Sequence, residues 1–277
     1  MASLTDHVVE GLKYPFNDIK KLLGFGGLFA VISVISVFMS VKSFDIFKGV
    51  IHTSETNGIP IHLSFSQLPA GDMYLLAGLG VVSLIISLFI MGYQYNIVKF
   101  SIEKKEDLPG FSNILGMLVN GIKYLIVTLA YNIIPILVLA CGLILVRDSS
   151  VLLVIGLISA LLFIIAFFLQ VMALNNMVAH DSLKKAFDFR EIIGNISNLG
   201  WGKYIGIILF TLIVYMIIMI AVSVILGYVT VIFAATISNQ ALVIAVVIAV
   251  IEGLFIDSYG AIFFSRVYGS IYRESIK

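Results

Sequence analysis

Two acidic residues stand inside the last long apolar stretch of the chain, where ionisable side chains are least expected. Glu252 directly follows the apolar run 248–251, and Asp257 comes five residues later. A charged side chain at the centre of a membrane-spanning helix costs about 2.5 to 3.5 kcal/mol on insertion scales, so something must compensate for this cost. Glu252 and Asp257 are therefore the intramembrane ionisable candidates.

The spacing of the two carboxyls does not favour a shared proton. On an ideal α-helix they lie about 140° apart, which predicts that Glu252 and Asp257 occupy different faces. No Lys, Arg or His lies at a similar depth in another apolar stretch. Glu252 is predicted either to be neutral, because burial disfavours the charged form, or to face water, an ion or a partner subunit. A proton relay and a hydrogen-bonded structural carboxyl both fit.

A second group of candidates surrounds a proline in an earlier apolar stretch. Pro135 has no N–H, so it leaves the carbonyl of residue 131 unbonded and predicts a kink just after Asn132. Broken helices line substrate pathways when the freed groups face a cavity. Gln170, in the next stretch, first predicts an interhelical hydrogen bond. Asn132, Pro135 and Gln170 thus mark either a pathway with a kink or helix packing.

The elements that position these residues are membrane-length helices. The chain is 60% hydrophobic and 12% charged, whereas a soluble domain is about 25% charged. The sequence predicts an all-α integral membrane protein with residues 1–277 as a single transmembrane domain. A longer, tilted fifth helix is an alternative, because residues 229–237 are also apolar. The predicted spans are residues 22–41, 73–98, 124–146, 151–174, 204–228 and 241–265, each long enough to cross about 30 Å of hydrocarbon.

The distribution of basic residues predicts an orientation. Alternating connections hold fourteen of the seventeen Lys and Arg residues, and the opposite side holds only Lys42, Lys48 and Arg147. Because Lys and Arg stay on the cytoplasmic side, both termini are predicted to be cytoplasmic in a multi-pass cell-membrane protein.

A short pattern precedes each odd-numbered span: Phe, any residue, a short polar or acidic residue, then Ile. It predicts a cytoplasmic interfacial amphipathic helix before each of three hairpins, with Phe and Ile facing acyl chains. The hairpins would form parallel repeat units 1–98, 99–174 and 175–277; alternatively, every interfacial entry helix needs such residues without duplication. The copies are residues 16–19, 111–114 and 189–192.

The outer loop between spans 1 and 2 has a different periodicity. Apolar and polar residues alternate over 59–66, after Asn57 and Gly58. This period of two predicts a small β-like hairpin on the membrane surface.

Several short motifs carry a family resemblance. They are Gly92-Tyr93, the run 107–111, the run 121–124, and 13–15 with Asp18. Together they resemble a prokaryotic, largely archaeal family of integral membrane proteins, domain of unknown function 4013. The resemblance implies a cytoplasmic-membrane protein and supplies no activity, cofactor or catalytic residue.

Known catalytic motifs are absent from the sequence: it holds no P-loop, no His-Glu-x-x-His and no nucleophile elbow. We predict no catalytic residue, no cofactor, no metal and no nucleic-acid partner. An enzyme, such as a lipid-modifying one using His180 and Asp181, is the least favoured interpretation. The sequence favours a permease or transporter component, or alternatively a non-catalytic membrane scaffold or assembly factor. Its partners would be the lipid bilayer and either another membrane protein or a second copy.

Overall fold

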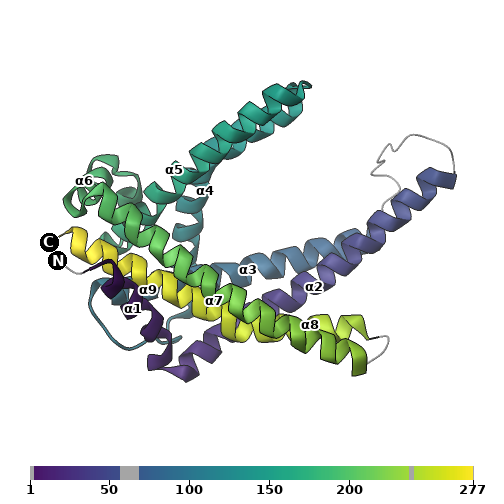
Figure 1. Cartoon of the computed structure of the whole chain (residues 1–277), viewed down its shortest axis with the longest axis horizontal. Helices are drawn as coiled ribbons and strands as arrows, with labels where there is room; N and C mark the ends of the chain where they lie inside the picture. Colours follow the sequence, from purple (N-terminus) through teal and green to yellow (C-terminus); the bar gives the residue numbers. More distant parts are fainter. Residues whose placement is uncertain (1–2, 57–68, 237–239, 277) are drawn as a thin grey trace. The chain divides into compact units, whose positions relative to one another are not determined.

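The structure, a computed structural model, describes residues 3–56, 69–236 and 240–276, and these residues form helices with short connections and no strand. Six helical stretches are long and apolar enough to cross a membrane. The chain is therefore an all-helical protein of multi-pass membrane type. In chain order (Figure 1) the elements are α1 (Leu4–Lys13), η1 (Tyr14–Asn17), α2 (Ile19–Thr56), α3 (Ala70–Ile102), α4 (Ile114–Leu145), α5 (Ser149–His180), η3 (Leu183–Phe187), α6 (Phe189–Leu199), α7 (Trp201–Thr236), α8 (Ala241–Ile251), η4 (Glu252–Asp257) and α9 (Ser258–Ser275).

The helices extend beyond the apolar blocks. The fifth membrane-length helix, α7, continues past Tyr228 to Thr236, as the alternative of a longer fifth helix anticipated. No Gly or Pro lies between these residues to end it. The sixth stretch begins at Ala241 and comprises α8, η4 and α9. The predicted β-like hairpin at 59–66 lies outside the described residues.

The chain divides into two compact units that separate the candidate residues. The first comprises residues 1–21, 91–219 and 260–277, and the second comprises residues 22–90 and 220–259. Asn132, Pro135 and Gln170 therefore belong to the first unit, and Glu252 and Asp257 belong to the second.

Within the first unit, α4 and α5 pack side by side as an antiparallel pair (Figure 1). Gly142 allows their close approach, because a Cβ at this position would overlap the Ile155 side chain. Asp148 begins α5 by accepting hydrogen bonds from the backbone N–H groups of Ser150 at 2.8 Å and Val151 at 3.1 Å. Such an N-cap satisfies amides that the helix itself leaves unpaired.

The connection between α3 and α4 is held by side chains from distant parts of the first unit. Pro109 and Gly110 disfavour helix there, so this segment contains no separate interfacial helix, and α4 begins only at Ile114. Backbone carbonyls of residues 105–109 instead accept side-chain hydrogen bonds. The donors are Arg266 to Lys105 (2.6 Å), Asn17 to Glu106 (2.8 Å), Tyr14 to Asp107 (2.7 Å), Lys21 to Leu108 (2.7 Å) and Tyr93 to Pro109 (2.9 Å).

Several residues of the family motifs make these contacts. The Tyr93 ring also stacks on Phe111, with centroids 4.6 Å apart. The neighbouring Gly92 lies so close to the backbone of Met117 that any Cβ would overlap it. The motifs Gly92-Tyr93, 107–111 and 13–15 thus meet at one structural junction.

A buried arginine joins α9 to α1 in the first unit. Arg266 is 4% exposed and pairs with Glu10 at 2.8 Å, and its guanidinium lies 4.2 Å from the centre of the Tyr14 ring. His7 adds a second connection, through Nδ1 to Ser270 and Nε2 to Glu274, both at 2.8 Å. Burial raises the pKa of Tyr14 to about 12, although the neighbouring arginine opposes this shift.

The third copy of the repeated pattern differs from its prediction. A separate helix, α6, does precede α7, but Ile192 is fully buried against the protein instead of facing acyl chains. Asn195, Ile196 and Leu199 share this buried face, with the three- and four-residue spacing of one helix side. Phe189, in contrast, is 50% exposed.

The second unit brings η4 against α2. Gly26 lies against the backbone oxygen of Leu254, and Gly253 lies against the backbone of Ala30, so a Cβ at either glycine would overlap main-chain atoms. Paired small residues commonly allow such close backbone contact between membrane helices. An ion pair of 3.2 Å between Lys42 and Asp72 also joins α2 to α3.

Candidate functional site

A row of polar side chains follows one face of α4. Tyr124, Thr128 and Asn132 are each four residues apart, so they lie one above another along the helix. The Asn132 amide donates to the Thr128 carbonyl at 2.8 Å and to Gln170 Oε1 on α5 at 2.7 Å. Gln170 in turn donates to the Thr128 hydroxyl at 3.2 Å. Gln170 thus makes the interhelical hydrogen bond suggested by the sequence, with Asn132 as its partner.

This row leads to a small cavity of about 100 Å³ between α3, α4, α5 and α9. A water molecule needs roughly 10 to 15 Å³ of such space, so several fit. Five polar side chains line the cavity. We call them, together with Thr128 and Asn132, the polar track; the five are Tyr124, Gln170, Asn175, Ser265 and Tyr268.

Asn175 is the unusual member of the polar track. Its side chain is 2% exposed, and its amide donates to the Val171 carbonyl of its own helix at 2.7 Å. Its Oδ1 atom has no hydrogen-bond partner among the described residues. The hydroxyls of Tyr124 and Tyr268 also bond to none of these residues. The cavity therefore offers an unsatisfied acceptor and two free hydroxyls to whatever enters it.

The neighbouring amide, Asn176, differs from Asn175 because its side chain bonds to two other segments. Asn176 donates to the Lys185 carbonyl at 2.9 Å and accepts from the Tyr272 hydroxyl of α9 at 2.7 Å. Adjacent residues of a helix point about 100° apart, so the two amides meet different surroundings. The four-residue spacing of Tyr124, Thr128 and Asn132 was the signal that could have located the cavity.

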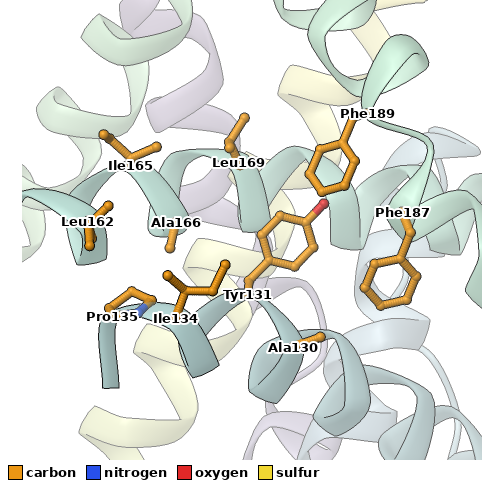
Figure 2. Close-up of a pocket in the computed structure, with 10 residues that line it drawn as sticks. All are labelled: Ala130, Tyr131, Ile134, Pro135, Leu162, Ile165, Ala166, Leu169, Phe187 and Phe189. Carbon is orange, nitrogen blue, oxygen red and sulfur yellow. The ribbon is translucent and has the colours of Figure 1, made fainter. Parts of the chain in front are cut away.

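Pro135 lies inside the uninterrupted helix α4 and lines a second, apolar pocket of about 210 Å³. Figure 2 shows the Tyr131 ring at its centre, with Phe187 and Phe189 from the following segment beside it. The Tyr131 hydroxyl donates to the Ala186 carbonyl at 2.7 Å. The kink at Pro135 remains a prediction. The side chains around Pro135 in this pocket are almost all apolar. The other lining residues are Ala130, Ile134, Leu162, Ile165, Ala166 and Leu169.

Ion pairs organise the end of α5. Lys123 donates to Asp181 at 2.8 Å and, with the Tyr95 hydroxyl at 2.7 Å, holds the pKa of this carboxyl below its ordinary value. His180 pairs separately with Glu191 at 2.9 Å. His180 and Asp181 therefore have different partners. Asp181 instead terminates α5 in a left-handed conformation, with φ of 47°.

A second ionic group fixes η3 to the start of α6. Lys185 contacts both Asp188, at 3.1 Å, and Glu191. Hydrogen bonding to Glu191, and then to Asp188, raises the pKa of Lys185. The same contact with Lys185 lowers the pKa of Glu191. These charges are mutually compensated, so this group is architectural.

The carboxyl candidates occupy a π-helical turn, η4, which begins at Glu252 and ends at Asp257. A π-helix closes hydrogen bonds between a residue and the fifth residue after it, so these positions lie about one turn apart. The wide separation predicted on an ideal α-helix therefore does not apply to these two positions. Glu252 is exposed and Asp257 is partly buried.

Neither carboxyl takes part in any ion pair formed by the described residues. No group of three His, Cys, Asp or Glu side chains in the same part of the chain is arranged to hold a metal. Single π-helical turns within helices frequently occur at functional sites. Glu252 and Asp257 thus remain uncompensated acidic groups within an apolar helix.

Six helices long and apolar enough to cross a membrane define an integral membrane protein of multi-pass type. The sequence profile of the protein of unknown function family DUF4013 matches residues 75–227, and the chain belongs to this family. It is also 23% identical to the uncharacterized protein MJ1189 of Methanocaldococcus jannaschii over 300 aligned positions, which cover all of this chain and 99% of the relative. No solved structure matches the chain significantly.

Proposed function

We propose that this protein is a permease or transporter component that admits a small polar solute through the polar track. The observation that carries the proposal is the cavity beside the unbonded Oδ1 of Asn175. Leaving a buried acceptor unsatisfied costs about 1 to 3 kcal/mol. A protein with only a scaffolding role gains nothing from this arrangement, whereas a solute or water that donates a hydrogen bond there recovers the loss.

The lining of the track indicates the chemical class of the solute. Amides and hydroxyls both donate and accept hydrogen bonds, and the cavity lining contains no charged side chain. An ion would therefore lose hydration without gaining a counter-charge. The favoured solute is small, polar and uncharged in transit, with Gln170 and Asn132 extending the hydrogen-bonding surface toward Pro135.

Glu252 and Asp257 would supply the coupling to a proton or cation. Both belong to the single η4 turn, and no described basic side chain forms an ion pair with either. A carboxyl in such surroundings binds a proton readily and releases it when water or a cation reaches it. In this proposal both termini are cytoplasmic, because fourteen of the seventeen basic residues lie on that side. The chain would reside in the cytoplasmic membrane of an archaeon.

Flux measurements in proteoliposomes test the proposal. Purified protein is reconstituted in vesicles that contain a pH-sensitive dye, and a potassium diffusion potential is imposed. We expect protein-dependent proton entry in the wild type and its loss in Glu252→Gln, because the amide has the size of the carboxyl but cannot carry the proton. Glu106→Gln is the matched control, since it removes an acidic group from the exposed α3–α4 connection.

A substitution at Asn175 tests the role of the polar track. Asn175→Leu removes the acceptor and fills part of the cavity, so solute-stimulated proton entry should fall severalfold, whereas Asn198→Leu on the exposed side of α6 should leave it unchanged. Proton entry that is equal in wild type, Glu252→Gln and Asn175→Leu would overturn the proposal.

One observation favours the alternative, a non-catalytic scaffold or assembly factor. Glu252 is exposed on its helix, so a partner subunit or second copy with a basic side chain would compensate it. This alternative predicts a stoichiometric partner in native membranes that dissociates in Glu252→Gln, with no proton entry in vesicles. A partner that stays bound to Glu252→Gln would contradict it.

A further inference from the structure

We propose that the apolar pocket beside Pro135 (Figure 2) binds an anionic phospholipid, independently of any transport role. One acyl chain would lie against α4 and α5, and the phosphate would lie at Lys184 and Arg190. Both the shape of the pocket and the charges beside it point to this occupant.

The pocket accepts hydrocarbon and offers nothing to a polar ligand. Nine of its ten lining residues are apolar, and the tenth, Tyr131, already donates its hydroxyl to the Ala186 carbonyl. Ile134 is 62% exposed and Ile165 is 48% exposed, so the pocket opens sideways between two membrane-length helices. At this position the surrounding medium consists of acyl chains.

One end of the pocket is formed by residues 184–190, which contain both aromatic and charged side chains. Phe187 and Phe189 stand beside the Tyr131 ring, with centroids 6.1 and 6.0 Å away, and close the pocket toward η3 and α6 (Figure 2). An acyl chain that enters the pocket from the bilayer would therefore end close to Lys184 and Arg190, which flank the two phenylalanines in sequence. This matches an amphipathic ligand with its head at that end.

The charges beside the two phenylalanines select the headgroup. Lys184 and Arg190 flank them in sequence, both are exposed, and neither forms an ion pair with the described residues. Lys185, between them, is fully engaged with Asp188 and Glu191. Two cations without counter-charges beside an apolar pocket attract an anionic lipid, and Arg favours phosphate through paired hydrogen bonds.

Fluorescence quenching by brominated lipids tests the site. Trp201 is the only tryptophan, so a Trp201→Phe background permits a single reporter, Leu169→Trp, in the pocket wall. Nanodiscs contain a small fraction of either phosphatidylglycerol or phosphatidylcholine with brominated acyl chains. We expect severalfold stronger quenching by the brominated phosphatidylglycerol. Adding Lys184→Gln and Arg190→Gln should make the two lipids equivalent, whereas Lys13→Gln with Lys20→Gln removes the same charge elsewhere and should preserve the preference.

Native mass spectrometry of the protein without the tryptophan changes gives a second measurement. The wild type should retain phosphatidylglycerol in preference to phosphatidylcholine, and the Lys184→Gln, Arg190→Gln variant should lose this preference. Equal retention of the two lipids by the wild type would overturn the proposal, as would an unchanged preference in the variant. A dimer that carries no lipid would instead assign the pocket to a second copy and also overturn it.

Discussion

Arg266 in the first unit and Glu252 in the second are both charged residues placed among apolar helices, yet their surroundings differ completely. The arginine is 4% exposed and meets the Glu10 carboxylate, the Lys105 carbonyl and the face of Tyr14. Glu252 is exposed on its helix and has no ion-pair partner among the described residues. The first charge is matched on several sides, whereas the second is unmatched.

The difference separates charges that hold the fold from charges available for function. A buried charge whose partners are all in place is destabilising to remove, because the partners then lose their compensation. An unmatched carboxyl contributes no such contacts, so its retention at a cost indicates another role. Substitutions at the two positions should therefore have opposite effects on stability and activity.

The largest expected effect is at the matched charge. Arg266→Met keeps the side-chain length but removes the contacts with Glu10, Lys105 and Tyr14, so we expect the free energy of unfolding to fall by about 2 to 3 kcal/mol. Arg273, at 2.9 Å from Glu10, limits the loss. Thermal unfolding in detergent, followed by circular dichroism, measures it. Arg190→Met, at an exposed site without an ion pair, is the control, and an equal effect in both variants would contradict the comparison.

Much of the fold followed from the sequence. Apolar blocks longer than a bilayer's thickness located all six membrane-length helices, because hydrophobic length is a property of the local sequence. The connection before α4 could not be inferred in this way. Its conformation depends on Tyr14, Tyr93 and Arg266, which come from separate regions of the chain. The burial of Ile192 likewise depends on tertiary packing, which the local sequence does not specify.

The candidate site was predictable only in part. Asn132 and Gln170 stood out as polar residues in apolar helices, and the structure joins them by a hydrogen bond. The π-helical turn was not foreseen, and neither were the close contacts of Gly26 and Gly253 with the facing backbone in the same region. The free acceptor of Asn175 was also missed, since only packing decides which of two neighbouring amides finds a partner.

The hydrogen bond between the neutral amides of Asn132 and Gln170 should contribute less to stability than the matched charge of Arg266. Double-mutant cycles of Asn132→Val and Gln170→Leu should give a coupling free energy near 0.6 kcal/mol and at most about 1.7 kcal/mol, as for other hydrogen bonds between membrane helices. Reversible unfolding in mixed micelles supplies the measurement. Asn132→Val with Asn198→Leu is the control cycle and should show no coupling, because the Asn198 amide donates to the Ser275 carbonyl and shares no partner with Asn132. Strict additivity of the first pair would show that the bond contributes nothing.

Matched charges at the surface should have a weaker, pH-dependent effect. Lys185 lowers the pKa of Glu191 below its ordinary 4.5, and Glu191 raises the pKa of Lys185 above its ordinary 10.5. Their contribution is therefore complete between these values. It is lost as the pH falls below 4.5 through the folded-state pKa of Glu191, or rises above 10.5 through that of Lys185. Because both side chains are partly exposed, the contribution of this ion pair to stability should be small. Thermal unfolding between pH 3 and 7 should show a shallower pH dependence in Glu191→Gln, and an unchanged profile would contradict this.

The smallest expected change in stability is at the unmatched charge. Glu252→Gln keeps the shape and polarity of the side chain while removing its charge, so the free energy of unfolding should stay within about 0.5 kcal/mol of the wild type or rise. Thermal unfolding should be measured on the same protein preparation that is reconstituted in proteoliposomes, so that stability and proton entry are compared on one sample. Lost proton entry with unchanged stability would assign Glu252 to function, as the contrast with Arg266 implies. A loss of stability as large as that of Arg266→Met would instead show that a counter-charge is present, and the distinction between matched and unmatched charges would fail.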